Sequence, residues 1–374
     1  MTENKETKDT AFLPKKPKHP WKNVLLILIF IAINAAVIIS TAVNEFGNSD
    51  NAQNFAEIRI NWWMLLPAVL CFAVALIAEI FKYVLMIYRM SDEKKTNEQK
   101  KKIVRNSWKV ARRTVILGKY YDSITPAAIG GQPFQIYYMR KHSGLTKGEA
   151  NSIPMFGMVS NQIGFLVIAV FCFIFGNVFK SYPALIVTAW IGLAVYAFWP
   201  VMLLGISFFP KPTAKFINFI VRLLAKIRII KDVKKATEKM DEEINEYSKS
   251  IKIILHERGL FVEIILLSIL FNALIASIPF FVLTAFGGEL NFFDCLALTV
   301  AVTSAVYFVP TPGNSGAAEG TFYLVFSALS SGYVFWAMLF WRFFSYYIYI
   351  IMGPITYLSM HFEKKRLENE EAKQ

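Results

Sequence analysis

The sequence is poor in residues that bind metals or form disulfide bonds, with three cysteines and four histidines among 374 residues. Cys71, Cys172 and Cys295 all lie inside apolar blocks and lack metal-ligand spacing, so we expect them to be small buried hydrophobic side chains. The histidines are scattered along the chain. This scarcity speaks against a disulfide framework and a metal centre, and we expect no cofactor.

The sequence also lacks common catalytic motifs and a secretion signal. It has no Gly-Lys-Ser/Thr phosphate loop, no His-Glu-x-x-His motif and no Gly-x-Ser-x-Gly motif. Membrane transferases often lack such motifs, so an enzymatic role stays open. Residues 1–20 are polar and lysine-rich, and no cleavage pattern of small residues follows them, so we expect a disordered cytoplasmic arm rather than a signal peptide.

Hydrophobic residues make up 55% of the chain and include 33 phenylalanines. They form unbroken blocks, and roughly 20 apolar residues of helix cross the hydrocarbon core of a bilayer. The pattern predicts an all-α polytopic membrane protein whose integral domain covers residues 21–360, with about six full transmembrane helices. The expected spans are residues 21–43, 62–88, 154–175, 182–209, 260–286 and 333–360.

Basic residues outnumber acidic ones, 40 to 27, and give a formal net charge of +13. Such an excess is typical of nucleic-acid binding or of the cytoplasmic loops of membrane proteins. Here the basic residues lie between apolar blocks, above all at 89–113, so we expect cytoplasmic loops and no DNA partner. Both termini, the tail 361–374 and an amphipathic, charged helical insert at 212–258 are then cytoplasmic.

Two apolar regions are interrupted by the same pattern. Thr125-Pro126 and Thr311-Pro312 are each followed, after three further residues, by a glycine. Threonine caps helices and proline fits their first turn, so each motif predicts the start of a half-helix inside the membrane. The first hairpin would enter from the cytoplasm and the second from outside, as in an inverted repeat. Alternatively, both motifs are loops, and residues 291–331 fit either two short spans or one re-entrant hairpin.

Several charged residues lie inside the apolar blocks, where burying an unpaired charge costs at least roughly 2.5 kcal/mol. Glu79 lies in the second span, Glu319 follows the second broken motif, and Arg342 lies in the last span. One interpretation is an internal ion pair of Glu79 or Glu319 with Arg342. The other is a polar cavity that accepts a lipid head group. For Lys82 and Glu263 we expect side chains that reach a membrane interface.

Three segments resemble a known family in their order and spacing: residues 130–138, residues 310–320, and the last span with Trp341, Arg342, Tyr346, Tyr347 and Gly353. They are similar to the lysylphosphatidylglycerol synthase transmembrane (flippase) family over nearly the whole of residues 21–360. The resemblance implies a multi-pass protein of the bacterial cell membrane. In two-part members, the membrane half moves aminoacylated phosphatidylglycerol across the bilayer. A soluble domain of those members transfers lysine from lysyl-tRNA to the lipid.

The resemblance and the buried charges together predict a lipid-binding site. By the resemblance, Arg342 and the starts of the half-helices meet the lipid phosphate, while Glu319, Gln132 and Gln135 shape or neutralise the head-group site. Asn314 stands where the family often has another small residue, so the resemblance does not fix the identity of the head group. The predicted lipid-binding residues are Glu79, Gly130, Gly131, Gln132, Gln135, Arg140, Gly313, Asn314, Glu319 and Arg342.

Three functions fit the sequence. The first is a flippase for a phospholipid, such as phosphatidylglycerol or its lysyl derivative, or for a polyprenyl-linked lipid. The second is a phosphatidylglycerol lysyltransferase, although only a short charged tail follows the last span, so we expect no synthase domain. The third is a membrane anchor for a separate synthase, with residues 232–258 as the docking helix. A second copy of the chain is a further candidate partner.

Overall fold

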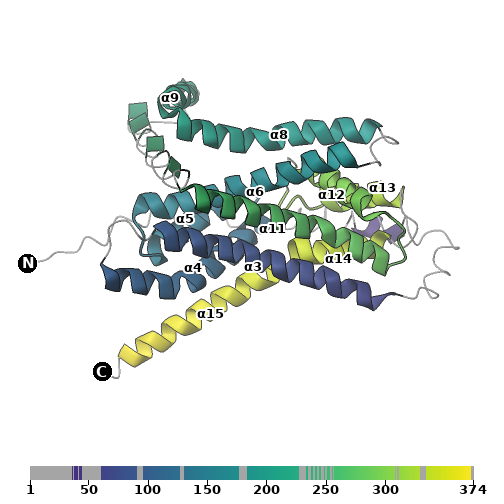
Figure 1. The fold of residues 1–374 in the computed structure, drawn as a ribbon, viewed down its shortest axis with the longest axis horizontal. Helices are drawn as coiled ribbons and strands as arrows, with labels where there is room; N and C mark the ends of the chain where they lie inside the picture. The colour runs from purple at the N-terminus through teal and green to yellow at the C-terminus, as the bar shows by residue number, and fades with distance from the viewer. Residues whose placement is uncertain are drawn as a thin grey trace, which may run out of the picture.

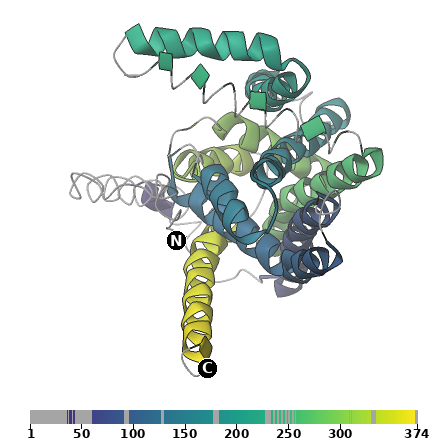
Figure 2. The ribbon, with the colours of Figure 1, turned by 90° about the vertical axis from the view of Figure 1, so that its left-hand side faces the viewer.

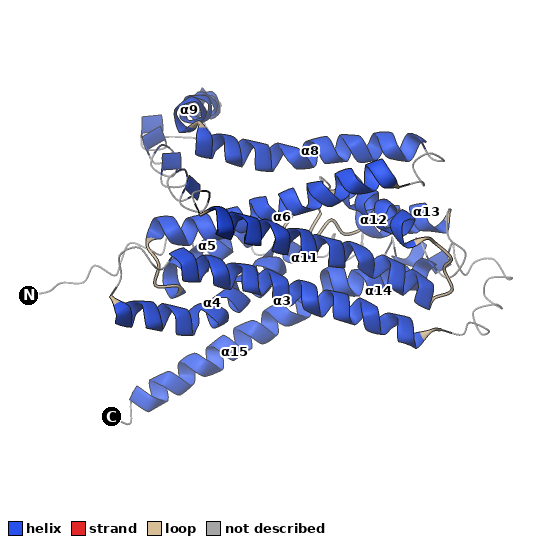
Figure 3. Ribbon diagram, viewed as in Figure 1, coloured by secondary structure: helices blue, strands red, loops and turns tan. Residues whose placement is uncertain are grey.

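The computed structural model is helical throughout the part of the chain that it describes (Figure 3). The described residues are 36, 38–40, 42–43, 60–90, 96–126, 130–176, 183–226, single residues and pairs between 233 and 255, then 257–307, 309, 311–328 and 334–371. No strand occurs among them. The predicted arm at 1–20 and most of the predicted span at 21–43 lie outside the described residues.

Figure 1 labels most of the described helices. The described helices are η2 (Trp62–Met64), α3 (Leu65–Met90), α4 (Asn97–Ile124), α5 (Gly131–His142), α6 (Lys147–Phe175), α8 (Pro183–Phe208), α9 (Pro210–Lys226), α11 (Arg258–Ala285), α12 (Phe292–Val306), α13 (Ala317–Ser327), α14 (Val334–Arg342), the π-helix η3 (Phe343–Tyr347) and α15 (Ile348–Glu371). The all-α membrane architecture predicted from the sequence is confirmed.

Four helical stretches among the described residues are long and apolar enough to cross a membrane. They are Trp62–Met90, Lys147–Phe175, Arg258–Ala285 and Val334–Glu370. The predicted count of six full spans is therefore not confirmed. Within α8, only the shorter apolar stretch Ala189–Met202 was found, and the predicted span at 21–43 is mostly undescribed.

Capping residues explain why one span begins earlier than predicted. Thr146 and Glu149 form a capping box at the start of α6, with the Thr146 amide donating to Glu149 Oε2 at 2.8 Å. Such a box satisfies amides that have no partner inside the helix. The helix therefore begins at Lys147 and runs through Pro154, where the predicted span began.

The described residues between 291 and 328 form a re-entrant hairpin and not two spans. α12 has 15 residues and α13 has 11. At 1.5 Å per residue, neither covers the roughly 30 Å of a hydrocarbon core. Figure 1 shows both helices entering from the end of the bundle opposite to the hairpin of α4 and α5.

Apart from η2, α8 and α9, the described elements form two units of opposite direction. The first unit is α3, the hairpin α4–α5, and α6. The second is α11, the hairpin α12–α13, and the continuous stretch α14–η3–α15. α3 packs along α11, each hairpin contacts the last helix of the other unit, and the two units run in opposite senses across Figure 1. This is the inverted repeat that the two broken motifs predicted.

The exposed and buried faces of α3 show that hydrocarbon surrounds the bundle. Leu66, Leu70 and Ile77 are about half exposed, whereas Glu79 and Lys82 are buried. An apolar outer face around buried charges is the reverse of a soluble protein and suits a helix whose solvent is lipid.

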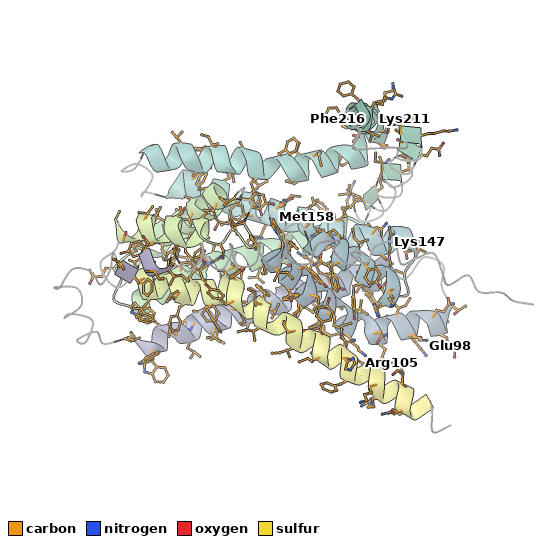
Figure 4. All side chains as sticks on the ribbon, turned by 180° about the vertical axis from the view of Figure 1, so that it is seen from behind. Glu98, Arg105, Lys147, Met158, Lys211 and Phe216 are labelled. Carbon is orange, nitrogen blue, oxygen red and sulfur yellow. The ribbon has the colours of Figure 1, made fainter. Side chains whose placement is uncertain are left out.

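Two helices leave this bundle (Figure 2). α15 projects from one side, and α9 lies across the opposite side. Phe216 and Lys211 of α9 point away from the bundle in Figure 4, and Phe216 is 63% exposed. α9 covers the start of the predicted insert at 212–258.

We predict that Gly164→Ala destabilises the fold by about 1–3 kcal/mol, because its methyl group overpacks the contact of α6 with α11. A Cβ atom there would lie 2.7 Å from the backbone carbonyl of Ser268. Thermal unfolding of the purified protein in detergent measures the effect. Gly205→Ala is the control, since a Cβ atom at Gly205 has no neighbour within 4 Å. Equal melting temperatures for both variants would contradict the close packing.

Candidate functional site

The tips of the two re-entrant hairpins meet inside the bundle. Pro126 and Pro312 form an isolated antiparallel backbone bridge. These prolines occupy the same position in the two Thr-Pro motifs, so the bridge lies where the axis relating the two units is expected. The hydroxyl of Tyr346 also donates to the carbonyl of Ser123 at 3.2 Å, which ties the first tip to the last span.

The first tip satisfies its own backbone through side chains. Thr125 Oγ1 accepts from the amide of Gly130 at 2.9 Å and donates to the carbonyl of Tyr121 at 2.7 Å. Asp122 Oδ1 accepts from the amide of Gly131 at 2.9 Å. The prediction that Thr125 starts a half-helix is wrong, because Thr125 caps the end of α4 and α5 begins at Gly131.

The second tip is built from residues with left-handed backbone. Gly313, Asn314 and Gly316 have φ values of 56°, 56° and 87°. Glycine adopts such angles without strain, which explains its presence at two of the three positions. α13 begins after this turn at Ala317, so here too the helix starts after the glycine and not at the Thr-Pro pair.

A buried ion pair holds the second tip in place. Arg342 Nε donates to Glu319 Oε1 at 2.7 Å, and these residues are only 4% and 1% exposed. Arg342 Nη2 also donates to Ser315 Oγ at 2.9 Å and to the carbonyl of Gly313 at 3.2 Å. The guanidinium lies 4.5 Å from the ring centre of Tyr346. The interpretation of Glu319 and Arg342 as an internal ion pair therefore matches the structure.

Glu79 belongs to a second buried cluster. Its carboxylate lies 2.8 Å from Lys82 Nζ and accepts from Asn161 Nδ2 at 2.9 Å. Lys82 Nζ also donates to Asn161 Oδ1 at 2.7 Å and to Ser268 Oγ at 3.2 Å. The expectation that Lys82 reaches an interface is wrong, since Lys82 is 0% exposed. Lys82 Nζ also lies 3.4 Å from the carbonyl of Gly157. Gly157 and Asn161 belong to α6 and Ser268 to α11, so the cluster joins these two helices to α3. Glu263 is exposed, as expected.

Two further predicted residues position the first hairpin. Gln135 Oε1 accepts from the hydroxyl of Tyr83, and Gln135 Nε2 donates to the carbonyl of Thr114, both at 3.3 Å. Arg140 Nε donates to Asn151 Oδ1. These contacts bind α5 to α3, α4 and α6.

Two predicted residues leave buried acceptors without a hydrogen bond. Gln132 Oε1, at the start of α5, and Asn314 Oδ1, in the second tip, have no partner within the described part of the chain. Buried polar atoms without partners are rare, and each asks for an explanation such as a ligand. Gln132 belongs to the first hairpin and Asn314 to the second. Each lies close in sequence to the proline, Pro126 or Pro312, at which the two tips meet.

A cavity of about 980 Å³ lies between α4, α5 and α15. It extends from Gly130 and Tyr121 near the first tip to charged residues of α4 and α15. Figure 4 labels Arg105, which lies one helical turn before Lys109 in the N-terminal half of α4. The lining residues are Asn106, Lys109, Val110, Arg113, Tyr121, Gly130, Pro133, Phe134, Tyr137, Tyr138, Lys141, His142, Tyr357, Met360, His361 and Glu363.

Stacked aromatic rings form one wall of this cavity, which we call the aromatic ladder: Tyr121, Phe134, Tyr138 and His142. The ring centres of Tyr121 and Phe134 are 4.5 Å apart, those of Phe134 and Tyr138 6.0 Å, and those of Tyr138 and His142 4.2 Å. The hydroxyls of Tyr121 and Tyr357 lie 2.7 Å apart and join α15 to the ladder. Sequence reasoning missed it, although Phe134, Tyr138 and His142 recur every four residues on one face of a helix.

A comparison with protein families identifies the family of this chain. A family model described as the lysylphosphatidylglycerol synthase TM region matches residues 23–353. The chain belongs to this family. Searches for curated relatives and for similar solved structures gave no match.

Within the lysylphosphatidylglycerol synthase TM family fold, the predicted site residues divide into four groups. Gly131, Gln132, Gln135 and Arg140 lie on α5. Gly130 lines the cavity. Gly313, Asn314, Glu319 and Arg342 build or hold the second tip. Glu79 lies in the cluster with Lys82. The structure thus unites the four residues of the second tip and places Glu79 in a separate ion pair.

We predict that Arg342→Met destabilises the protein by about 3–5 kcal/mol, because it leaves the carboxylate of Glu319 buried without its counter-charge. The double variant Arg342→Met with Glu319→Gln should recover part of this loss. Thermal unfolding of both variants in detergent measures the coupling. Arg366→Met is the control, since Arg366 pairs with Glu370 at the surface. An unchanged melting temperature in Arg342→Met would show that the pair contributes nothing.

Proposed function

We propose that this member of the lysylphosphatidylglycerol synthase TM family translocates a phospholipid, such as phosphatidylglycerol or its lysyl derivative, between the leaflets of the bilayer. The observation that carries the proposal is the meeting of Pro126 and Pro312. Two hairpins that enter from opposite sides and touch leave only a short protein barrier between the two aqueous faces. Transporters built from inverted repeats place their substrate site at such a junction.

The cavity supplies a route for a head group toward this junction. A phosphate or an ammonium group cannot cross hydrocarbon without a large desolvation penalty. Cationic side chains at one end of the cavity attract phosphate, and the faces of the aromatic ladder attract ammonium groups through cation–π interactions. Gly130, at the inner end, brings this route to the first tip.

The two unpartnered acceptors support a head-group site beyond the cavity. Gln132 Oε1 and Asn314 Oδ1 would accept hydrogen bonds from the hydroxyls of a glycerol head group or from a lysyl ammonium group. Arg342 already binds Glu319, Ser315 and Gly313, so we assign it the positioning of the second tip. Its direct contact with a lipid phosphate stays a prediction.

We predict that the purified protein in liposomes moves fluorescent phosphatidylglycerol from the inner to the outer leaflet. Quenching of the outer leaflet by a membrane-impermeant reductant measures the rate. Phe134→Ala should slow translocation about three- to tenfold, because one ring contributes about 0.5–1.5 kcal/mol to stacking. Phe171→Ala is the control, since Phe171 lies 45% exposed on α6, outside the cavity lining.

Two results would contradict the proposal. Wild-type liposomes that move no more label than protein-free liposomes would exclude translocation of this lipid. Formation of lysyl lipid from lysyl-tRNA and phosphatidylglycerol by the purified chain would favour the transferase instead. Equal slowing by Phe134→Ala and Phe171→Ala would show that the aromatic ladder does not line the route of the head group.

A further inference from the structure

The charged end of the cavity carries more positive than negative side chains. Lys109 and Arg113 of α4 and Lys141 of α5 line it together with a single described carboxylate, that of Glu363 on α15. Glu363 Oε1 contacts Lys109 Nζ, and Glu363 Oε2 accepts from Arg113 Nη2 at 2.6 Å. One carboxylate from the last helix thus engages two cations of the first hairpin.

Arg113 is the buried member of this group. It is 7% exposed, and its buried Nε has no hydrogen-bond partner among the residues that the structure describes. A buried donor without a partner loses its hydration and gains nothing in return. A guanidinium presents its donors as a planar fork that matches the oxygens of a phosphate. Glu363 accepts from Nη2 of Arg113 but not from its Nε, so the carboxylate satisfies only part of the guanidinium.

Glu363 is bound in a way that permits exchange. Its side chain is 30% exposed and that of Lys109 is 39% exposed, so water competes for this part of the contact. Ion pairs with such exposure contribute little to stability. A phosphate monoanion or diester offers two free oxygens and displaces a carboxylate of the same charge without leaving the cations unpaired.

We propose that Lys109 and Arg113 form the binding site for the phosphate of a phospholipid head group, and that Glu363 occupies this site as a built-in competitor when no lipid is bound. The inference rests on the proposed function, which makes a phospholipid the substrate. To that function it adds a phosphate subsite, formed by Lys109 and Arg113, and a carboxylate, that of Glu363, which the lipid must displace in order to bind.

The outer face of α15 favours a lipid over free phosphate. Ile351, Ile355, Leu358 and Phe362 recur at helical spacing and are each more than half exposed. This stripe faces hydrocarbon, and Phe362 is the neighbour of Glu363 in the sequence. A phospholipid lying against α15 therefore keeps its acyl chains in hydrocarbon while its phosphate reaches the cations on α4.

Equilibrium binding to the purified full chain in detergent tests this site without requiring transport. The probes are short-chain phosphatidylglycerol, a short-chain diacylglycerol without phosphate, and inorganic phosphate, each titrated by calorimetry. Glu363→Gln should bind phosphatidylglycerol about fivefold more tightly, because removing the competitor makes the site fully available. Arg113→Gln should bind it about tenfold more weakly through loss of the charge-assisted hydrogen bonds.

Matched controls separate this site from general effects of charge. Glu370→Gln removes an exposed carboxylate from the same helix and should leave binding unchanged. Melting temperatures should confirm that Arg113→Gln is folded, and Arg113→Lys, which keeps the charge, should retain part of the affinity. Diacylglycerol should bind at least tenfold more weakly than phosphatidylglycerol.

The inference is overturned if Glu363→Gln binds phosphatidylglycerol no more tightly than the wild type. It is also overturned if inorganic phosphate binds as tightly as the lipid, since the site would then be a general anion site. Failure of translocation is a separate result. Liposomes without transport but with the expected pattern of affinities would contradict the proposed function and leave the phosphate site in place.

Discussion

Backbone that is not helical must find its hydrogen bonds inside the protein when it lies in a membrane, because hydrocarbon offers none. Both hairpin tips depend on this constraint. Thr125 and Asp122 cover amides at the first tip. At the second, Glu319 Oε2 accepts from the amide of Gly316, and Arg342 donates to the carbonyl of Gly313. The polar residues of the broken segments therefore make it possible for two turns to meet at depth.

The buried charges follow from the same constraint. A carboxylate in the bundle is tolerated when a cation and hydrogen-bonding neighbours surround it. Glu319 has Arg342 and Ser315, while Glu79 has Lys82 and Asn161. The first pair holds a tip. The second lies within α3, and its hydrogen bonds to Asn161 and Ser268 join α3 to α6 and α11. Both pairs thus contribute to the placement of helices distant in sequence, and neither behaves as an isolated charge awaiting a ligand.

The last span connects both hairpins. Arg342 holds the second tip, and Tyr346, four residues later, donates to the first. A π-helix begins directly after Arg342, and such insertions often mark functional sites. Farther along, Tyr357 closes the aromatic ladder and Glu363 reaches the cations of α4. A shift of α15 would therefore change the cavity and the junction of the tips together, which suits a protein that passes a head group from one to the other.

Apolar blocks, basic loops and two Thr-Pro motifs were sufficient to predict the membrane class, the location of the tips and their inverted order, because length, polarity and breaking residues act locally. The choice between Glu79 and Glu319 as the partner of Arg342 was beyond that reach. Arg342 bonds to Glu319, Asn161 of α6 and Ser268 of α11 bond to the Glu79–Lys82 pair, and a cavity forms where α15 crosses α4. These contacts depend on which faces of sequence-distant helices meet, and only tertiary packing decides that. The four-residue aromatic period of α5 was readable in the sequence, but the tertiary structure supplied the opposite wall that makes it a cavity.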